Sequence, residues 1–410
     1  MSNEVRGLEF PTLDDADVKG KTALVRVDIN SPIEPKTGEI LDDTRIRECA
    51  PTLKELSQSG AKVVVLAHQG RPGSEDFTTL EKHAKKMSSV LGLDVKYLAD
   101  VFGPSAHEAI KSLNPGEVLL LENVRFCDEE TITRPAEELA KTHLVRSLAG
   151  LVDVYVNDAF ATAHRSQASL VGFAVVLPTF AGRLMERELR GLSKALSPER
   201  PCIYVLGGAK VDDSLRIIEN VFGGGIADQV LTGGLVGQTF LAAAGWGIGK
   251  PNLVLLLKRG FEGEIERAKE LLATHGEKIQ MPKDVIVDDR GKSKELTLEQ
   301  FPTELSIYDI GSRTIGEYSG KIVDAKTVVA NGPLGAFENP MFARGTIEIL
   351  KAMARSKAFT VIGGGHMVAA ARAAGVIDEI KHVSTGGGAC ISFLSGEKLP
   401  AVEMLMLAKR

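Results

Sequence analysis

The chain is organised around short apolar runs rich in β-branched residues, each followed by a polar or glycine-rich turn and then by a helical pattern. In order along the sequence they read "TALVRVDIN", "VVVLAHQGRPG", "VLLLENVRF", "VYVNDAFATAHR", "CIYVLGGAK", "QVLTGGLVG", "TVVANGPLG", "FTVIGGG" and "HVSTGGG". Strands that are apolar without alternation and are separated by helices are typical of a parallel sheet covered on both faces. Ligands of such sheets bind at the carboxyl ends of the strands, so the residues that follow each run are the most informative.

Bulk properties narrow the class of protein. A chain of 410 residues is too long for one ordinary core and predicts about two or three domains. The net charge of −5 argues against nucleic acid as the main partner. No apolar run approaches the roughly 20 residues that span a bilayer, and residues 1–20 are polar and acidic, unlike a secretory signal. The 4 scattered cysteines form no C-x-x-C pair, which predicts a reduced, cytoplasmic protein with no thiolate zinc cage.

The turns of the first half are cationic. The candidate ligand-binding residues of this half are Asp28, Asn30, Arg45, His68, Arg71, Arg125 and Arg165. Guanidinium groups bind carboxylate and phosphate bidentately and keep their charge, so together they suit a small, multiply charged anion. Asp28 and Asn30 can accept the proton of a ligand hydroxyl. Any one of these arginines alone would read equally well as a solvated surface residue.

The turns of the second half are mostly bare backbone. They carry Gly207-Gly208 with Lys210, Gly233-Gly234, Asn331-Gly332-Pro333, Gly363–Gly365 and Gly386–Gly388. Glycine lets backbone N–H groups approach phosphate oxygens, and a following helix adds a favourable dipole, so this half is expected to bind a nucleotide. Neither the P-loop pattern nor a dinucleotide-binding G-x-G-x-x-G is present.

An amphipathic helix is predicted between the two halves at 183–196, with Met185, Leu189, Leu192 and Leu196 on one face. Pro198 follows and ends it. The predicted fold class is therefore α/β, with two doubly wound parallel-sheet (Rossmann-like) domains joined by a connecting helix.

The ordered motifs "RVDINSP", "DDTRI", "HQGRP", "LLENVRF", "YVNDAFATAHR", "LGGAKV", "ANGPLGAFE", "STGGGA" and "KLPAVEML" run almost from end to end. In these motifs the chain resembles the phosphoglycerate kinase family, and its details are similar to the archaeal branch. The resemblance implies a hinge-bending cytoplasmic enzyme of glycolysis and gluconeogenesis, which moves a phosphoryl group reversibly between 1,3-bisphosphoglycerate and ADP, giving 3-phosphoglycerate and ATP. It implies a phosphoglycerate-binding domain at 1–182, a connecting helix at 183–197, a nucleotide-binding domain at 198–390 and a return segment to the first domain at 391–410.

The resemblance also assigns roles to residues of this sequence. Arg45 and Lys210 would supply the catalytic charge. The substrate would be bound by Asp28, Ile29, Asn30, Arg45, His68, Gln69, Gly70, Arg71, Arg125 and Arg165. The nucleotide, as Mg²⁺–ATP or Mg²⁺–ADP, would be bound by Lys210, Gly233, Gly234, Asn331, Glu338, Gly364, Gly365, His366 and Met367.

The sequence departs from the family pattern at two places. His366 stands where most members have an aspartate associated with Mg²⁺–nucleotide binding, and Met367 stands where threonine or serine is usual. Because imidazole is a poor ligand for Mg²⁺, either the phosphates and water hold the ion, or His366 contacts a phosphate, caps the helix or only packs locally. Ser214 stands in place of a second lysine, whose charge would come from Arg216, from elsewhere, or not at all.

These departures leave an alternative function, a catalytically impaired nucleotide-binding sensor on the same fold. No nucleic-acid or membrane partner is expected. The residue that ligates the metal, the choice between ATP and GTP, and the choice between monomer and homodimer stay open.

Overall fold

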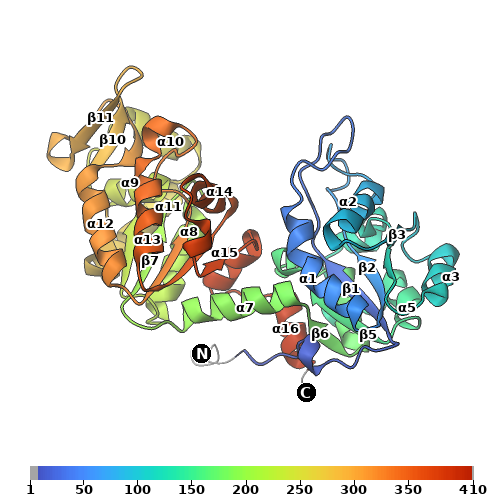
Figure 1. Ribbon diagram of the computed structural model, residues 1–410. Helices are drawn as coiled ribbons and strands as arrows, with labels where there is room; N and C mark the ends of the chain where they lie inside the picture. Colours follow the sequence, from blue (N-terminus) through green and yellow to red (C-terminus); the bar gives the residue numbers. More distant parts are fainter. Residues whose placement is uncertain (1–7, 409–410) are drawn as a thin grey trace. The chain divides into compact units, whose positions relative to one another are not determined.

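The computed structural model describes residues 8–408, which form two compact units. The N-terminal unit comprises residues 8–190 together with 398–408, and the C-terminal unit comprises Gly191–Glu397. The helix α7 (Arg183–Leu196) crosses the division between them along the chain (Figure 1). The last helix, α16 (Pro400–Leu407), belongs to the N-terminal unit, where the N–H of Ala401 donates to the carbonyl of Ala163 at 3.2 Å.

The N-terminal unit contains a six-stranded, fully parallel sheet in the order β3-β4-β2-β1-β5-β6. Its strands are β1 (Thr22–Val27), β2 (Lys62–Leu66), β3 (Val95–Tyr97), β4 (Val118–Leu120), β5 (Val154–Asp158) and β6 (Thr179–Ala181). Its further helices are α1 (Thr44–Gln58), α2 (Glu81–Leu91), α3 (Pro104–Ser112), α4 (Ala136–Leu139), α5 (His143–Ala149) and α6 (Phe173–Val176), with a π-helical turn, η5 (Ala168–Gly172).

The C-terminal unit contains a second six-stranded parallel sheet in the order β15-β14-β13-β7-β8-β9. Its strands are β7 (Cys202–Leu206), β8 (Gln229–Thr232), β9 (Ile279–Gln280), β13 (Thr327–Asn331), β14 (Phe359–Gly363) and β15 (His382–Val383). Its helices are α8 (Val211–Gly223), α9 (Gly234–Ala243), α10 (Lys250–Lys258), α11 (Glu262–His275), α12 (Ser312–Asp324), α13 (Arg344–Arg355), α14 (Gly365–Ala373) and α15 (Gly388–Leu394).

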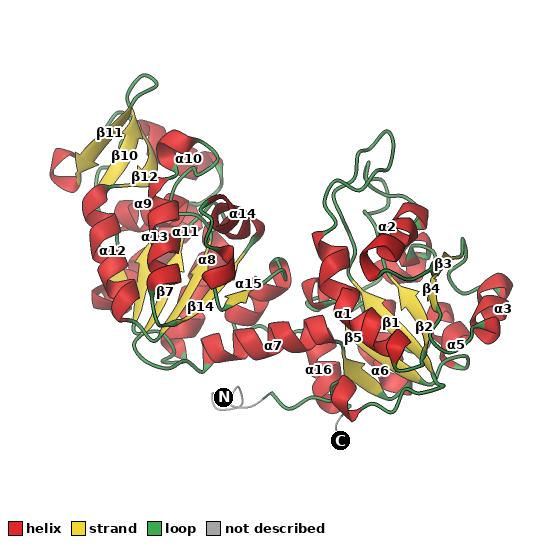
Figure 2. Cartoon of the chain, viewed as in Figure 1, coloured by secondary structure: helices red, strands yellow, loops and turns green. Residues whose placement is uncertain are grey.

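A small antiparallel sheet adds to the C-terminal unit, in the order β11-β10-β12 (Figure 2). Its strands are β10 (Asp284–Asp288), β11 (Ser293–Thr297) and β12 (Ser306–Ile310). It has its own apolar cluster, which includes Val285 and Val287 of β10 and Leu256 of α10.

The central strands of both parallel sheets are buried on both faces, which explains their continuous apolar sequences. All residues of β1 and all residues of β13 are buried. In the N-terminal unit, α1 and α2 pack their apolar stripes on one face of the sheet, where Leu53 and Met87 meet Val25 and Val65. Burial of this kind stabilises each unit through the apolar area removed from water.

The predicted fold class is confirmed, because each apolar run singled out in the sequence begins with or contains a strand of one of two parallel sheets. The edge strands β3, β6 and β9 and the antiparallel sheet were not predicted. In the described part of the chain, no helix combines the length and the apolarity needed to cross a bilayer.

Asp158 fastens the beginning of α7 to the sheet of the N-terminal unit. It ends β5, and its Oδ1 accepts a hydrogen bond from the N–H of Met185 at 3.0 Å. A Cβ on residue 182 would lie 2.3 Å from the same oxygen, so Gly182 is required there. Burial raises the pKa of Asp158 to about 7, against the hydrogen bond from Met185.

The substitution Asp158→Asn should change the pH dependence of stability. Because the pKa of Asp158 is higher in the folded protein than its ordinary value of 3.8, the folded state binds the proton more tightly. The contribution of Asp158 to the free energy of unfolding therefore falls as pH rises from about 4 to about 7, by at most roughly 1.4 kcal/mol per pH unit. Above about pH 7 this contribution is constant. Urea unfolding at a series of pH values should show the free energy of unfolding of the variant, minus that of the wild type, rising over this range.

Asp17→Asn is the matched control, because Asp17 lies in the same unit with its side chain 80% exposed. Its difference from the wild type should be small, because substitutions of exposed side chains usually change the free energy of unfolding by no more than about 0.5 kcal/mol. A flat difference for Asp158→Asn would contradict the expectation.

Candidate functional site

The predicted anion-binding residues of the N-terminal unit lie at the carboxyl edge of its sheet. The chain passes from β1 to β2 on one side and later returns with β5 on the other side of β1. Crevices outside such a reversal are the usual ligand sites of doubly wound sheets. Asp28 directly follows β1, His68 follows β2, and Arg125 follows β4.

Asp28 is a buried carboxylate whose oxygens are both engaged. Its Oδ1 accepts from the N–H of Asn30 at 3.0 Å, and its Oδ2 forms an ion pair with Arg45 of α1. Burial by itself would raise the pKa of Asp28, but the charge of Arg45, with the hydrogen bond from Asn30 and the charge of Arg26, outweighs it and the pKa lies below its ordinary value. Asp28 is therefore an ionised acceptor that holds Arg45 at the edge of the sheet.

The turn after β2 needs a glycine at position 70. Gly70 has φ +68°, and a Cβ there would lie 2.5 Å from the backbone nitrogen of Phe77. Its N–H donates to Asn30 Oδ1 at 2.8 Å, and its carbonyl accepts from Arg125 Nη1. This turn therefore ties two of the predicted substrate ligands together.

Gln69 and Ile29 lie in the interior of the N-terminal unit, next in the chain to the site residues Gly70 and Asp28. Both side chains are fully buried. The amide of Gln69 accepts from the N–H of Ser31 at 2.9 Å and donates to the carbonyl of Ser31 at 3.0 Å, and its oxygen also lies 3.0 Å from His83 Nε2. The side chain of Gln69 is thus engaged within the protein and holds the two turns in register.

Positive charge is concentrated at this edge. Burial, together with the charges of Arg165, Arg26 and Arg71, lowers the pKa of Arg125 to about 10. Burial followed by the charge of Arg71 likewise lowers the pKa of Arg165. Cations that destabilise one another in this way are stabilised by a bound anion. The clustering of the predicted arginines is the electrostatic signature of an anion site.

Sequence reasoning missed Arg26 as part of this cluster. It lies within β1, two residues before Asp28, and is only 1% exposed. The available signal was a single charge inside an otherwise apolar strand. Such a charge requires buried partners, and the structure provides them in Ser169 and Glu130.

The glycine turns of the C-terminal unit meet at an equivalent reversal, between β7 and β13. The N–H of Gly207 donates to the carbonyl of Asn331 at 3.0 Å, and the N–H of Gly208 donates to the carbonyl of Pro333 at 2.7 Å. The N–H of Gly234 donates to the carbonyl of Leu334 at 2.8 Å. The turns after β7, β8 and β13 therefore form one hydrogen-bonded backbone surface.

Close packing explains why these positions are glycine. A Cβ on Gly207 would lie 2.4 Å from the carbonyl oxygen of Pro333, and one on Gly233 would lie 2.5 Å from the side chain of Leu334. The glycines thus serve the mutual approach of the turns, in addition to any approach of a ligand.

The turn that begins α14 presents backbone N–H groups. Gly364 has φ +88°. In the first backbone hydrogen bond of the helix, the N–H of Val368 donates to the carbonyl of Gly364 at 3.2 Å. The N–H groups of 365–367 precede this bond and point beyond the start of the helix. The side chain of Met367 is buried in the core, so only its backbone can meet a ligand, whereas His366 is exposed with its ring 6.1 Å from that of Phe337.

Lys210 and Glu338 are exposed at the same edge. Lys210 immediately precedes α8, and its Nζ lies 3.9 Å from Asp213. Glu338 lies in the turn after β13. Both side chains are accessible to a ligand.

Arg216 does not supply the positive charge that a lysine at position 214 would carry. Ser214 is buried in α8. Arg216 forms ion pairs with Asp213 at 2.5 Å, Asp212 at 3.4 Å and Glu397. Three carboxylates compete for its guanidinium, which argues against Arg216 as the replacement.

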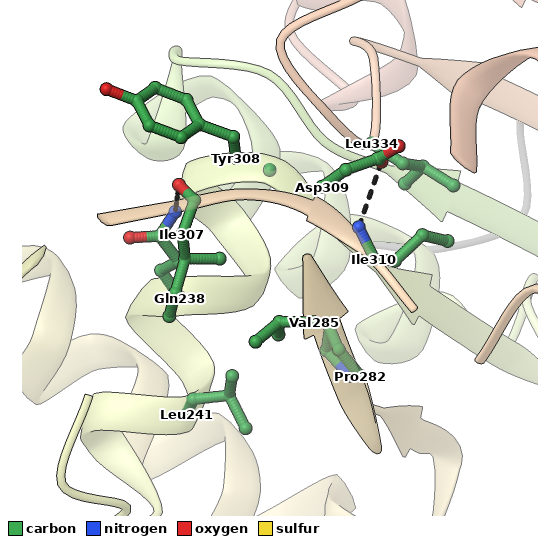
Figure 3. A pocket seen from close by; sticks show the side chains of 10 residues that line it. Gln238, Leu241, Pro282, Val285, Ile307, Tyr308, Asp309, Ile310 and Leu334 are labelled. Carbon is green, nitrogen blue, oxygen red and sulfur yellow. Dashed lines mark hydrogen bonds between the residues drawn. The ribbon is translucent and has the colours of Figure 1, made fainter. Parts of the chain in front are cut away.

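A cavity opens beside the start of α9 (Figure 3). It is lined by Gly234, Gln238, Leu241, Pro282, Val285, Ile307, Tyr308, Asp309, Ile310 and Leu334. Its walls are mostly apolar, and the Nε2 of Gln238 donates to the carbonyl of Ile307 at 3.1 Å. Burial raises the pKa of Asp309 to about 7, although backbone N–H groups of Gly345 and Ile310 donate to it.

A resident metal does not fit the turn before α14. Between Gly363 and Met367 its only side chain with a donor nitrogen or oxygen is the imidazole of His366, and Mg²⁺ prefers oxygen ligands. Among residues 8–408, no three His, Cys, Asp or Glu side chains gather so as to hold a metal ion.

Known proteins match this chain over nearly its whole length. The family model described as phosphoglycerate kinase matches residues 13–397. The phosphoglycerate kinase of Methanothermobacter thermautotrophicus is 54% identical over 398 residues, 97% of each chain, and that of Methanothermus fervidus is 51% identical over 403 residues, 98% of each chain. The crystal structure of phosphoglycerate kinase from Pyrococcus horikoshii OT3 superposes with a TM-score of 0.89 at 46% identity, covering 97% of this chain and 99% of that one. This chain belongs to the phosphoglycerate kinase family.

Proposed function

We propose that this protein is a phosphoglycerate kinase that transfers a phosphoryl group reversibly between 1,3-bisphosphoglycerate and ADP, giving 3-phosphoglycerate and ATP. The observation that carries the proposal is the cluster of arginines around an ionised Asp28 at one sheet edge. A glycerate phosphate combines negative charges with a hydroxyl group, and this cluster offers donors for the former and an acceptor for the latter.

The N-terminal unit is assigned the glycerate ligand. Arg71, Arg125 and Arg165 would bind its phosphate and carboxyl groups, and Asp28 and Asn30 would hold its hydroxyl. Arg45 is paired with Asp28, and its side chain is 36% exposed. Arg45 is thus held at the edge of the site with part of its guanidinium accessible to the transferring phosphoryl group.

The C-terminal unit is assigned the nucleotide. Lys210 and the N–H groups of 365–367 would contact the phosphates, since both favour negative charge. Glu338 would accept from the ribose hydroxyls. Gly233 and Gly234 would lie beside the base.

Phosphoryl transfer needs alignment and positive charge more than covalent help. Arg45 and Lys210 are the side chains assigned to stabilise the transferring oxygens. Because the two ligands are assigned to different units, the units must close for the transfer, and closure also excludes water that would hydrolyse the acyl phosphate. Hinge bending is therefore part of the proposed mechanism.

Magnesium would enter with the nucleotide as part of the substrate. The donor set of the α14 turn favours retention of Mg²⁺ by phosphate oxygens and water, with little ligation by protein. His366 would then contact a phosphate or remain at the surface.

The alternative is a nucleotide-binding sensor that has lost catalysis. The buried Ser214 and the ion-paired Arg216 favour it, because they leave Lys210 without a second cation. The fully assembled anion site favours the enzyme, since a sensor of nucleotide alone has no use for it. A cytoplasmic location, and a monomeric or homodimeric state, remain predictions.

The first test is turnover. ADP formation from ATP should depend on 3-phosphoglycerate, with excess Mg²⁺ and a trap for the acyl phosphate. Substrate-dependent turnover is expected. Nucleotide binding without any such turnover would contradict the proposed kinase function and favour the sensor.

Arg45→Ala should lower kcat by about 10²- to 10³-fold, because it removes a donor that acts on the transferring charge. Arg47→Ala is the matched control. Arg47 lies on the same helix, with its side chain 64% exposed and paired with Asp43. Steady-state kinetics should show nearly wild-type rates for this control. Equal losses in both variants would remove Arg45 from the proposed catalytic role.

His366→Asp should lower the Mg²⁺ concentration that gives half-maximal activity. A carboxylate in the first turn of α14 would offer an oxygen ligand and would interact favourably with the helix dipole. His366→Asn serves as the uncharged control and should leave the Mg²⁺ dependence close to that of the wild type. If the aspartate variant shows an unchanged or weaker Mg²⁺ dependence, this turn does not lie beside the metal–nucleotide.

A further inference from the structure

The N-terminal unit contains a buried polar chain that none of the proposed ligand contacts explains. It begins at Glu130, which is fully buried, passes through Ser169 and Arg26, and ends at His68. These residues come from four separate places in the sequence and meet behind the carboxyl ends of β1 and β2. A buried network of this kind is costly unless its members are satisfied, so its contacts are informative.

Glu130 and Ser169 form the inner end of the chain. Ser169, in the π-helical turn η5, donates through its N–H to Glu130 Oε2 at 2.8 Å and through its hydroxyl to Glu130 Oε1 at 2.5 Å. The single hydroxyl proton of Ser169 is therefore used on Glu130, and its oxygen remains an acceptor.

Arg26 continues the chain. Its Nε donates to Ser169 Oγ at 2.7 Å, and its Nη1 donates to the carbonyl of Val27. Its Nη2 lies 3.9 Å from Glu130 Oε1 and 3.1 Å from His68 Nδ1. Glu130 supplies the counter-charge that lets this guanidinium remain buried.

The contact between Arg26 and His68 has only one chemical reading. A guanidinium has five N–H donors, no acceptor, and does not lose its proton in proteins. His68 Nδ1 must therefore be the acceptor and carry no proton. The ring is neutral, its proton sits on Nε2, and Nε2 is the nitrogen left to donate to a ligand.

The surroundings of His68 agree with a neutral ring. Burial lowers the pKa of His68 well below its ordinary value, and the charges of Arg26, Arg125 and Arg165 lower it further, while Asp28 raises it. Among the charged groups around the ring, the cations thus outnumber the single carboxylate.

We propose that Glu130, Ser169 and Arg26 are positioning residues that fix His68 as the neutral Nε2–H tautomer, so that His68 meets the glycerate ligand as a hydrogen-bond donor and not as a cation. The identity of the ligand rests on the proposed function, but the tautomer does not. The arginines then supply the charge of the anion site, and His68 supplies a directed donor.

The test observes the tautomer directly in the full-length protein. Long-range ¹H–¹⁵N correlation spectra of ¹⁵N-histidine-labelled protein, with His68→Gln used to assign the signals, should show His68 protonated on Nε2 alone. The pattern should persist from about pH 5 to pH 8, where an ordinary histidine takes up a proton. A proton on Nδ1 in the wild type at neutral pH would overturn the proposal.

The double substitution R26M/E130Q tests the cause. It removes the donor and its counter-charge together, so that no unpaired buried charge is left to prevent folding. His68 should then lose the fixed tautomer and carry its proton on Nδ1 in part of the molecules, while burial and the charges of Arg125 and Arg165 still disfavour its cation. An unchanged His68 spectrum in this variant would show that Arg26 does not set the tautomer.

Ser169→Ala and Ser147→Ala form a matched pair. Ser169 acts through Arg26, whereas the hydroxyl of Ser147 lies 2.8 Å from a different histidine, His107. We expect Ser169→Ala to raise KM for 3-phosphoglycerate by about tenfold with a smaller effect on kcat, by analogy with residues that orient metal-binding histidines. Ser147→Ala should leave the His68 signals and the kinetics unchanged. Equal kinetic effects of the two variants would overturn the positioning role of Ser169. If the protein had no kinase activity but His68 still showed the fixed tautomer, only the proposed function would be rejected.

Discussion

The reversal of winding in each parallel sheet is the constraint on which the rest of the structure depends. In the N-terminal unit it lies between β1 and β5, and in the C-terminal unit between β7 and β13. Because chain segments leave a reversal in opposite directions, the carboxyl ends of the strands there stay uncovered. Asp28 follows one of these ends, and Gly207 and Gly332 follow the ends at the other. Both candidate sites are consequences of this topology.

The two edges solve different physical problems. At the first, cations must be held near one another, which requires a rigid support. The glycine at position 70, the engaged amide of Gln69 and the buried pair of Arg26 with Glu130 provide it. At the second, backbone turns must approach closely, and glycine is the residue that permits it. The first edge is therefore selective through side chains, and the second binds mainly through main-chain N–H groups.

The apolar runs were sufficient to predict the fold class, because a strand buried on both faces is apolar at most of its positions. They were not sufficient for β3 and β9, which have only 3 and 2 residues and owe their place to a neighbouring strand. The antiparallel sheet of β10, β11 and β12 was missed for a related reason. β11 ("SKELT") has mostly polar residues and is defined by its pairing with β10.

The sequence by itself determined which residue types follow each strand, and with them the expectation of an anion site and a nucleotide site, because the order of strands and turns is written along the chain. Only the tertiary structure decided what each side chain does there. It placed Met367 in the core, engaged Arg216 with acidic neighbours, and brought Glu130 to Arg26 across more than a hundred residues. The reason is physical: the charge and hydrogen-bonding state of a buried group depend on partners in space, and the sequence does not show how far apart those partners lie.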